Sequence, residues 1–149
     1  MHLEKLGRIH INNEEKIKEL LNDEQRSRLI IIDGRSGSGK TRLIKKVLVG
    51  FDNKVIIPYS EFIDLMVCDI KSRTDYFKES LFQYKIIAFD DIDFLRGKLA
   101  AQETTGYIIN SLLKSNIHVI LIGINLIERT PILLTTVNKE GITWITLHG

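Results

Sequence analysis

The chain has 149 residues, the length of one ordinary domain, and 44% of them are apolar while 27% are charged. This composition excludes a collagen-like, linker-like or disordered chain, and 21 basic against 19 acidic residues give a formal charge of only +2, which by itself indicates neither nucleic acid nor an anionic membrane as partner. One cysteine excludes an intrachain disulfide, and neither a signal peptide nor the roughly 18 apolar residues of a membrane span is found, so we expect a single cytoplasmic domain over residues 1–149.

The predicted elements alternate between helices and short apolar strands. Asn12, with Glu15 three residues later, predicts the capped start of a helix that carries Ile17 and Leu21 on one face. Four apolar runs without polar alternation are typical of strands buried on both faces, and residues 142–147 are typical of a strand near a sheet edge. The four runs are residues 29–32, 55–57, 86–89 and 119–122. This alternation predicts an α/β fold in which helices cover both faces of a parallel sheet.

The first apolar run leads directly into a phosphate-binding motif. Residues 34–41 read Gly-Arg-Ser-Gly-Ser-Gly-Lys-Thr, which fits G-x-x-x-x-G-K-[ST], and apolar residues at helical spacing follow. The glycines let backbone N–H groups point inward, and the positive end of the following helix completes a concavity for a polyphosphate. The alternative, a glycine-rich turn with a solvated lysine, would have to imitate both the motif and its setting.

Within this loop we assign Lys40 to the β and γ phosphates and the Thr41 hydroxyl to Mg²⁺. The predicted nucleotide-binding residues are Gly34, Arg35, Ser36, Gly37, Ser38, Gly39, Lys40, Thr41 and Arg42.

The third apolar run ends in Asp90 and Asp91, which has the form of a Walker B strand. Because the carboxyl ends of neighbouring parallel strands share one crevice, we expect Asp90 to reach the magnesium shell beside Thr41. Asp91 would then orient or deprotonate a water molecule. The alternative is an acidic turn whose carboxylates are solvated or cap the next helix, and Asp93 is interpreted as such a cap or as a surface residue.

Residues 86–98, followed by Gln-Glu at 102–103, resemble the Walker B region of the bacterial replication initiator family, DnaA. The family's sequence in this region runs in a fixed order: apolar residues, Asp-Asp-Ile, a polar residue, an apolar pair, Gly-Lys and then Gln-Glu. Upstream, Ser-Glu-Phe at 60–62 follows the family's order, and downstream residues 123–125 end the strand that carries the family's sensor 1 residue. The resemblance covers residues 29–147 and points to the initiator, loader and regulator branch of the AAA+ ATPases.

The resemblance implies a three-layer P-loop fold with five parallel strands in the order 5-1-4-3-2, and ATP or ADP with Mg²⁺ across the loop. It makes Asn125 the candidate sensor 1 residue, so the predicted catalytic residues are Asp91 and Asn125, although an ordinary turn role for Asn125 stays open. Positions 136–138 read Thr-Val-Asn where the family has its arginine finger, and Arg129 is out of register and is interpreted as a surface residue. The chain stops at Gly149, so we expect neither the helical lid nor the terminal DNA-binding domain.

In initiators and loaders, a helical insertion before Walker B and a basic position after it line a channel for single-stranded DNA. Here the insertion is residues 62–82, with Val67 at an apolar contact position and Lys98 at the basic one, but Cys68 and Ala100 stand where the family often has Lys and Arg. Binding of single-stranded DNA is therefore only weakly supported. Cys68 is interpreted as a small buried apolar residue.

We therefore predict an ATP- or ADP-binding DnaA-like protein that is a replication accessory or regulator. Without an arginine finger its intrinsic ATPase activity should be weak, and it should act through a protein partner: an initiator, a helicase or a second copy of itself. Two alternatives remain. Residues 31–41 also read like the first strand and loop of small nucleoside or nucleotide kinases, although no Arg-rich lid follows Asn125, and a degenerate P-loop protein could bind nucleotide only structurally.

Overall fold

The computed structural model describes residues 13–137 and 141–148. Its elements are a helix over residues 13–21, β1 (Leu29–Gly34), α2 (Lys40–Leu48), β2 (Lys54–Pro58), α3 (Tyr59–Ser72), α4 (Tyr76–Leu81), β3 (Ile86–Asp90), the 3₁₀ helix η1 (Ile92–Leu95), α5 (Leu99–Lys114), β4 (His118–Gly123), α6 (Leu126–Arg129), α7 (Pro131–Thr136) and β5 (Ile142–Leu147). The five predicted strands are confirmed, each to within two residues at either end. Asn12, the predicted cap of the first helix, lies outside the described residues.

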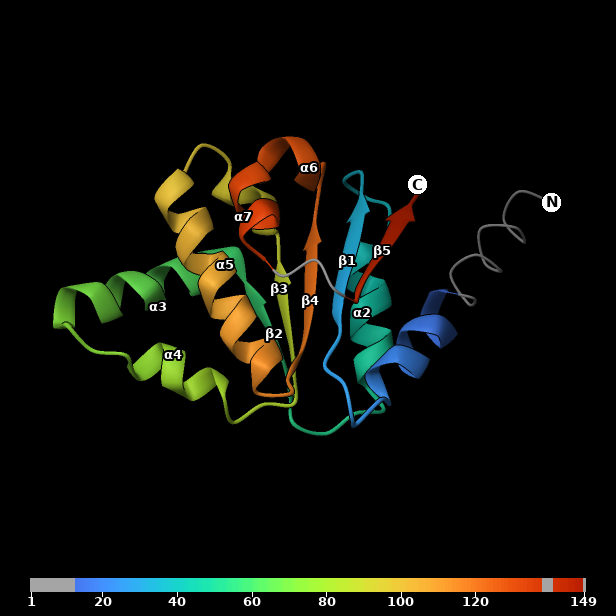
Figure 1. The fold of residues 1–149 in the computed structure, drawn as a ribbon. Helices are drawn as coiled ribbons and strands as arrows, with labels where there is room; N and C mark the ends of the chain where they lie inside the picture. Colours follow the sequence, from blue (N-terminus) through green and yellow to red (C-terminus); the bar gives the residue numbers. More distant parts are fainter. Residues whose placement is uncertain (1–12, 138–140, 149) are drawn as a thin grey trace.

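The five strands form one parallel sheet in the order β2-β3-β4-β1-β5, which confirms the predicted 5-1-4-3-2 order (Figure 1). Every residue of β3 and β4 is buried. This burial explains why these strands read as continuous apolar runs, because a strand covered on both faces has no wet side to carry polar residues.

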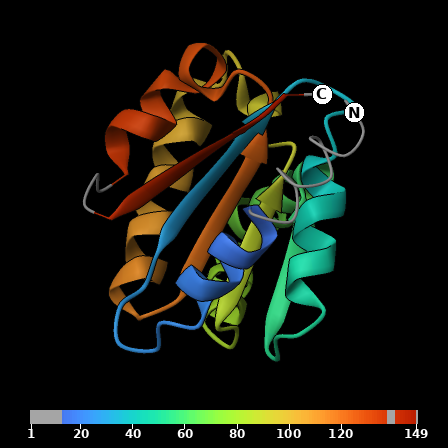
Figure 2. The ribbon, with the colours of Figure 1, turned by 90° about the vertical axis from the view of Figure 1, so that its right-hand side faces the viewer.

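Helices α3, α4, α5 and α7 cover one face of the sheet, while α2 and the helix over residues 13–21 cover the other (Figures 1 and 2). Successive side chains of each strand supply the two cores in turn. On β1, Ile31 enters the core beneath α5, and Ile30 and Ile32 enter the core beneath α2. The fold is thus the predicted three-layer P-loop architecture.

The insertion between β2 and β3 forms α3 and α4, which are joined through a buried carboxylate. Asp69 of α3 is 9% exposed and accepts the backbone N–H of Phe77 and of Lys78 as well as the Thr74 hydroxyl. Two N–H groups at the start of α4, which have no partner within a helix, are satisfied in this way. None of the described helices is long and apolar enough to cross a membrane.

At the amino edge of the sheet, His118 holds the segment that leads into β1. Its Nδ1 accepts the backbone N–H of Arg28 at 3.0 Å, and its Nε2 lies 3.0 Å from the Asp23 carbonyl oxygen. This pair of partners requires a neutral ring that carries its proton on Nε2. Burial lowers the pKa of His118 below its ordinary value, because an imidazolium would be poorly solvated there.

Lowering the pH is therefore expected to reduce the free energy of unfolding through protonation of His118. The pKa of His118 is lower in the folded chain than the ordinary 6.5. The contribution of the neutral His118 ring to the free energy of unfolding is therefore complete above about pH 6.5, and it is lost as the pH falls toward the pKa in the folded chain. Urea unfolding at pH 7 and pH 5 should show a smaller pH dependence of the free energy of unfolding for His118→Gln than for the parent. His148→Gln, at an exposed position, is the control, and an equal pH dependence in all three proteins would contradict the assignment.

Candidate functional site

The phosphate-binding motif forms a loop between β1 and α2 at the carboxyl edge of the sheet. Gly37 and Gly39 have φ angles of 80° and 88°, a conformation that glycine adopts without steric cost. A Cβ at Gly34 would lie 2.7 Å from the Leu147 carbonyl oxygen, so only glycine lets the loop pack this closely on β5. The three glycines are thus required by the shape of the loop.

Lys40 is folded back onto the loop. Its Nζ donates to the carbonyl oxygens of Gly34 at 2.7 Å and Arg35 at 2.8 Å, and only 8% of the residue is exposed. Burial lowers the pKa of Lys40, while the negative charges of Asp93 and Asp33 oppose that change. The Lys40 ammonium attracts an anionic ligand, and the surrounding carboxylates favour a ligand that brings a cation with it.

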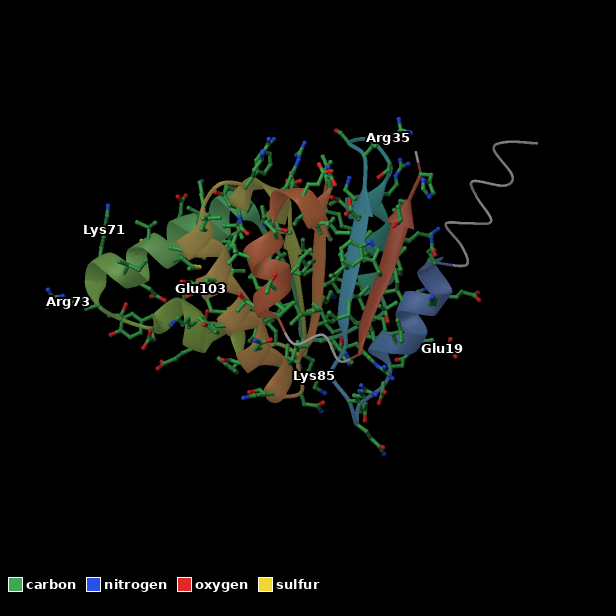
Figure 3. All side chains as sticks on the ribbon, turned by 45° about the horizontal axis from the view of Figure 1, so that its top comes forward. Glu19, Arg35, Lys71, Arg73, Lys85 and Glu103 are labelled. Atoms are coloured by element: carbon green, nitrogen blue, oxygen red, sulfur yellow. The ribbon has the colours of Figure 1, made fainter. Side chains whose placement is uncertain are left out.

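The first turn of α2 has no side-chain cap and no acidic residue. Its backbone N–H groups, which have no partner within the helix, therefore remain available to an anion. Arg35, Ser36 and Gly37 are exposed at the tip of the loop, where Figure 3 shows Arg35 pointing outward, and Arg42 is exposed on α2. Ser38 is buried, with its hydroxyl 3.5 Å from Lys40 Nζ.

Thr41 and Asp90 meet as predicted. The Thr41 hydroxyl donates to Asp90 Oδ2 at 2.9 Å, and Asp90 Oδ1 accepts the backbone N–H of Asp91 at 2.9 Å. Asp90 is 8% exposed. One hydroxyl and one carboxylate fit the hard oxygen ligands that Mg²⁺ takes from a protein when phosphates supply others. Within the described part of the chain, no three His, Cys, Asp or Glu side chains form a metal-binding group, so the protein alone offers no complete metal cage.

Asp91 directly precedes η1 in a left-handed conformation with φ of 56°, and it is exposed. Its carboxylate forms no hydrogen bond or salt bridge within residues 13–137 and 141–148, although the positive charge of Lys40 acts on it. Partial withdrawal from water, reinforced by the charges of Asp90 and Asp93, raises the pKa of Asp91. A free carboxylate with a raised pKa is suited to accept a proton from water.

Asn125 follows β4 at the same edge, also with a positive φ, of 50°. Its side-chain amide donates to Glu128 Oε2 at 2.8 Å. The loop itself is held by Asp33, which accepts the N–H of Asn125 at 2.8 Å and the N–H of Leu126 at 3.0 Å. Asp33 was not among the predicted site residues, although an acidic residue at the end of an apolar strand, directly before a phosphate loop, was a usable signal.

The structure corrects the expectation that Asp93 and Arg129 are surface residues. Asp93 is not a surface residue, because only 3% of it is exposed and its Oδ1 accepts the N–H of Ile124 at 3.2 Å. Arg129 is not simply a surface residue either, since its Nη1 lies 3.2 Å from Asp93 Oδ2. The pair links η1, which follows the Walker B strand, to α6, and the hydrogen bond from Ile124 links η1 to the loop that carries Asn125.

Two further expectations concern α3 and the segment before β5. Cys68 is exposed, not buried, because α3 turns the face with Phe62 and Met66 toward the sheet. Of the positions aligned with the arginine finger, Thr136 donates its hydroxyl to the Ile132 carbonyl oxygen and Val137 is buried. The third, Asn138, lies outside the described residues.

Lys98 is engaged with Tyr59 at the start of α3. The Lys98 ammonium donates a hydrogen bond to the Tyr59 hydroxyl and lies 5.1 Å from the centre of the ring. Tyr59 also packs against Phe94, whose side chain is 58% exposed, with 5.5 Å between ring centres. The predicted basic position is thus part of an exposed aromatic and cationic cluster.

The family model of the bacterial DnaA ATPase domain matches residues 12–144. The solved structure of AMPPCP-bound DnaA from Aquifex aeolicus is similar over 89% of this chain, with 25% identity and a TM-score of 0.67. A replication initiator DnaA bound to AMPPCP and single-stranded DNA is also similar over 89% of this chain, with 25% identity and a TM-score of 0.68. The DnaC helicase loader shares the fold at 15% identity, with a TM-score of 0.72 over 89% of this chain and 86% of its own. The matched region is 44% of either DnaA structure, and the comparison with curated proteins gave no match.

Breaking the pair of Asp93 and Arg129 should destabilise the fold. Arg129→Ala leaves a buried carboxylate without its cation, and we expect a loss of about 2 to 4 kcal/mol in the free energy of unfolding. Asp93→Asn keeps an acceptor for Ile124 and removes the charge, so Arg129→Ala should cost much less in that background. Urea unfolding of the four proteins measures the coupling, and additive losses would contradict a direct interaction.

Proposed function

Since the chain belongs to the family of bacterial DnaA ATPase domains, we propose that it binds ATP or ADP together with Mg²⁺ at the loop of residues 34–41. The observation that carries this proposal is the hydrogen bond between Thr41 and Asp90 beside the buried Lys40. A glycine-rich turn with a solvated lysine, or an acidic turn exposed to water, would account for neither contact. AMPPCP in the similar DnaA structures supports a nucleotide as the ligand.

Within the site, each group has a distinct role in binding. The uncapped N–H groups at the start of α2 donate to phosphate oxygens, and Lys40 exchanges the carbonyl oxygens of Gly34 and Arg35 for the β and γ phosphates. Thr41 and Asp90 hold the metal ion. When bound, Mg²⁺ neutralises charge on the phosphates.

We assign ATP hydrolysis, at a low rate, to Asp91 and Asn125. Asp91, with its raised pKa and free carboxylate, orients a water molecule and takes up its proton. Asn125 contacts the γ-phosphate after its amide leaves Glu128. An arginine that stabilises the transferred phosphoryl group is worth about 10³ to 10⁵ in rate, and the described residues before β5 supply none at the aligned positions.

The proposed role is that of a replication accessory or regulator whose nucleotide state is read by a protein partner: an initiator, a helicase or a second copy. Single-stranded DNA, present in one similar DnaA structure, is a further candidate ligand, and the exposed cluster of Tyr59, Phe94 and Lys98 is where we would seek it. The match covers under half of the DnaA structures, so the activities of a whole initiator are proposals only.

Mg-ATP should raise the melting temperature of the chain, because a ligand that binds only the folded state stabilises it. Lys40→Ala should abolish this rise, and titration with a fluorescent ATP analogue should show loss of binding. Lys45→Ala, at an exposed position on the same helix, is the matched control and should behave like the parent. An undiminished rise in Lys40→Ala would exclude the proposed site.

The isolated chain should hydrolyse ATP far more slowly than ~1 s⁻¹, the low end for kinases, and Asp91→Asn should reduce even this rate while leaving ATP binding intact. Phosphate release measured with single-stranded DNA and with candidate partner proteins tests for stimulation. Transfer of phosphate to a panel of nucleosides would instead establish a kinase. Tight nucleotide binding with no hydrolysis under any of these conditions would identify a structural ligand.

A further inference from the structure

The outer side of β2 is an open sheet edge. Within the described part of the chain β2 pairs only with β3. Ile86 donates its N–H to the Asn53 carbonyl oxygen, and backbone groups of a parallel strand alternate between its two sides, so those of Val55 and Ile57 face β3. The N–H and C=O groups of Lys54 and Ile56 therefore point away from the sheet, where a further strand could pair with them.

A groove of about 380 Å³ lies beside this edge, between β2 and the last turn of α2. Leu48 and Val49 line it from the helix side, and Val55 and Ile56 line it from the strand side. Val49 is 79% exposed, although exposure of a valine costs free energy in water. In Figure 2, α2 and β2 lie next to each other at the right-hand side of the molecule.

Two lysines stand at the rim of the groove. Lys45 comes from α2 and Lys54 from β2, and neither ammonium forms an ion pair or hydrogen bond with any described residue. Lys46, by comparison, is paired with Glu14 at 3.4 Å. Asp52, close to Lys54 in sequence, lines a separate cavity. The groove thus combines an apolar floor with an unbalanced positive rim.

The edge also discriminates among possible strands. Lysine and proline on an edge strand discourage indiscriminate pairing, and β2 has Lys54 at its start and Pro58 at its end. Pairing a strand beside the charged Lys54 is unfavourable, but it becomes favourable when that strand carries a carboxylate that can pair with the lysine. Charge therefore selects an acidic partner from among extended segments.

We propose that this groove binds an extended segment of a partner protein, added to the sheet as a strand beside β2, in which apolar residues and carboxylates share the alternate positions that face α2. The segment exchanges main-chain hydrogen bonds with Lys54 and Ile56. Its apolar side chains lie on Leu48 and Val49, and its carboxylates pair with Lys45 and Lys54. Because Lys54 and Ile56 alternate with Val55, both point to the α2 side of the sheet, where Lys45 also lies.

The groove is separate from the phosphate loop. The loop precedes the first turn of α2, whereas Leu48 and Val49 lie at the last, so a partner strand would leave Lys40 and Thr41 uncovered. The proposal therefore does not rest on nucleotide binding, and failure of either would not imply failure of the other.

A selection of random displayed peptides tests the proposal. Peptides of about a dozen residues are selected on the full chain, and those that also bind Val49→Asp are removed; Val49 is exposed, so this variant should fold. We expect enriched sequences in which apolar residues and Asp or Glu share every second position, on one face of the strand, and which contain no central proline. Bound peptide should slow hydrogen exchange at the Lys54 and Ile56 amides.

Charge reversal supplies the decisive comparison. By fluorescence anisotropy, Lys45→Glu/Lys54→Glu should weaken binding of an enriched peptide about tenfold or more, and exchanging the peptide's carboxylates for lysines should restore it. Lys71→Glu/Lys114→Glu makes the same change in net charge on α3 and α5 and should have little effect. The proposal is overturned if no peptides are enriched, or if the enriched peptides are basic or bind as helices. It is also overturned if both double variants weaken peptide binding equally.

Discussion

The hydrogen bond between Thr41 and Asp90 is the contact on which the organisation of the site depends. It joins two motifs that are 49 residues apart, one after β1 and one at the end of β3, with β4 between these strands. The contact is possible because all five strands run in the same direction, so their carboxyl ends meet at one edge. The buried apolar strands therefore do more than stabilise the core, since they bring a hydroxyl, a carboxylate and an ammonium to one place.

The carboxylates around Lys40 differ in what they are free to do. Asp33 is occupied by backbone N–H groups of the loop after β4, and Asp93 is occupied by Arg129 and by the N–H of Ile124. These two acids position the loop that carries Asn125. Asp90, whose oxygens accept the Thr41 hydroxyl and the Asp91 N–H, is the proposed ligand of the metal ion, and the Asp91 side chain forms no hydrogen bond within the described residues.

The two ends of α2 have different surroundings. Its first turn joins the phosphate loop and has no cap, which suits an anion. Its last turn leads to an exposed valine, and beside it lie a strand edge and two lysines that have no partner among the described residues, which suits an acidic extended segment. One rigid helix thus lies between the proposed nucleotide site and the proposed partner site, and each can be tested without the other.

Local patterns in the amino-acid sequence were sufficient to predict the strands, the phosphate loop and the place of Asp90, because apolar runs and glycine spacing act through neighbouring residues. The order of the strands came from the family resemblance. Only the tertiary structure identified Asp33 as the anchor of the loop after β4, paired Asp93 with Arg129 and exposed Cys68. These outcomes depend on which face of a helix meets the sheet and on contacts between residues far apart in the chain, and packing of the whole domain decides both.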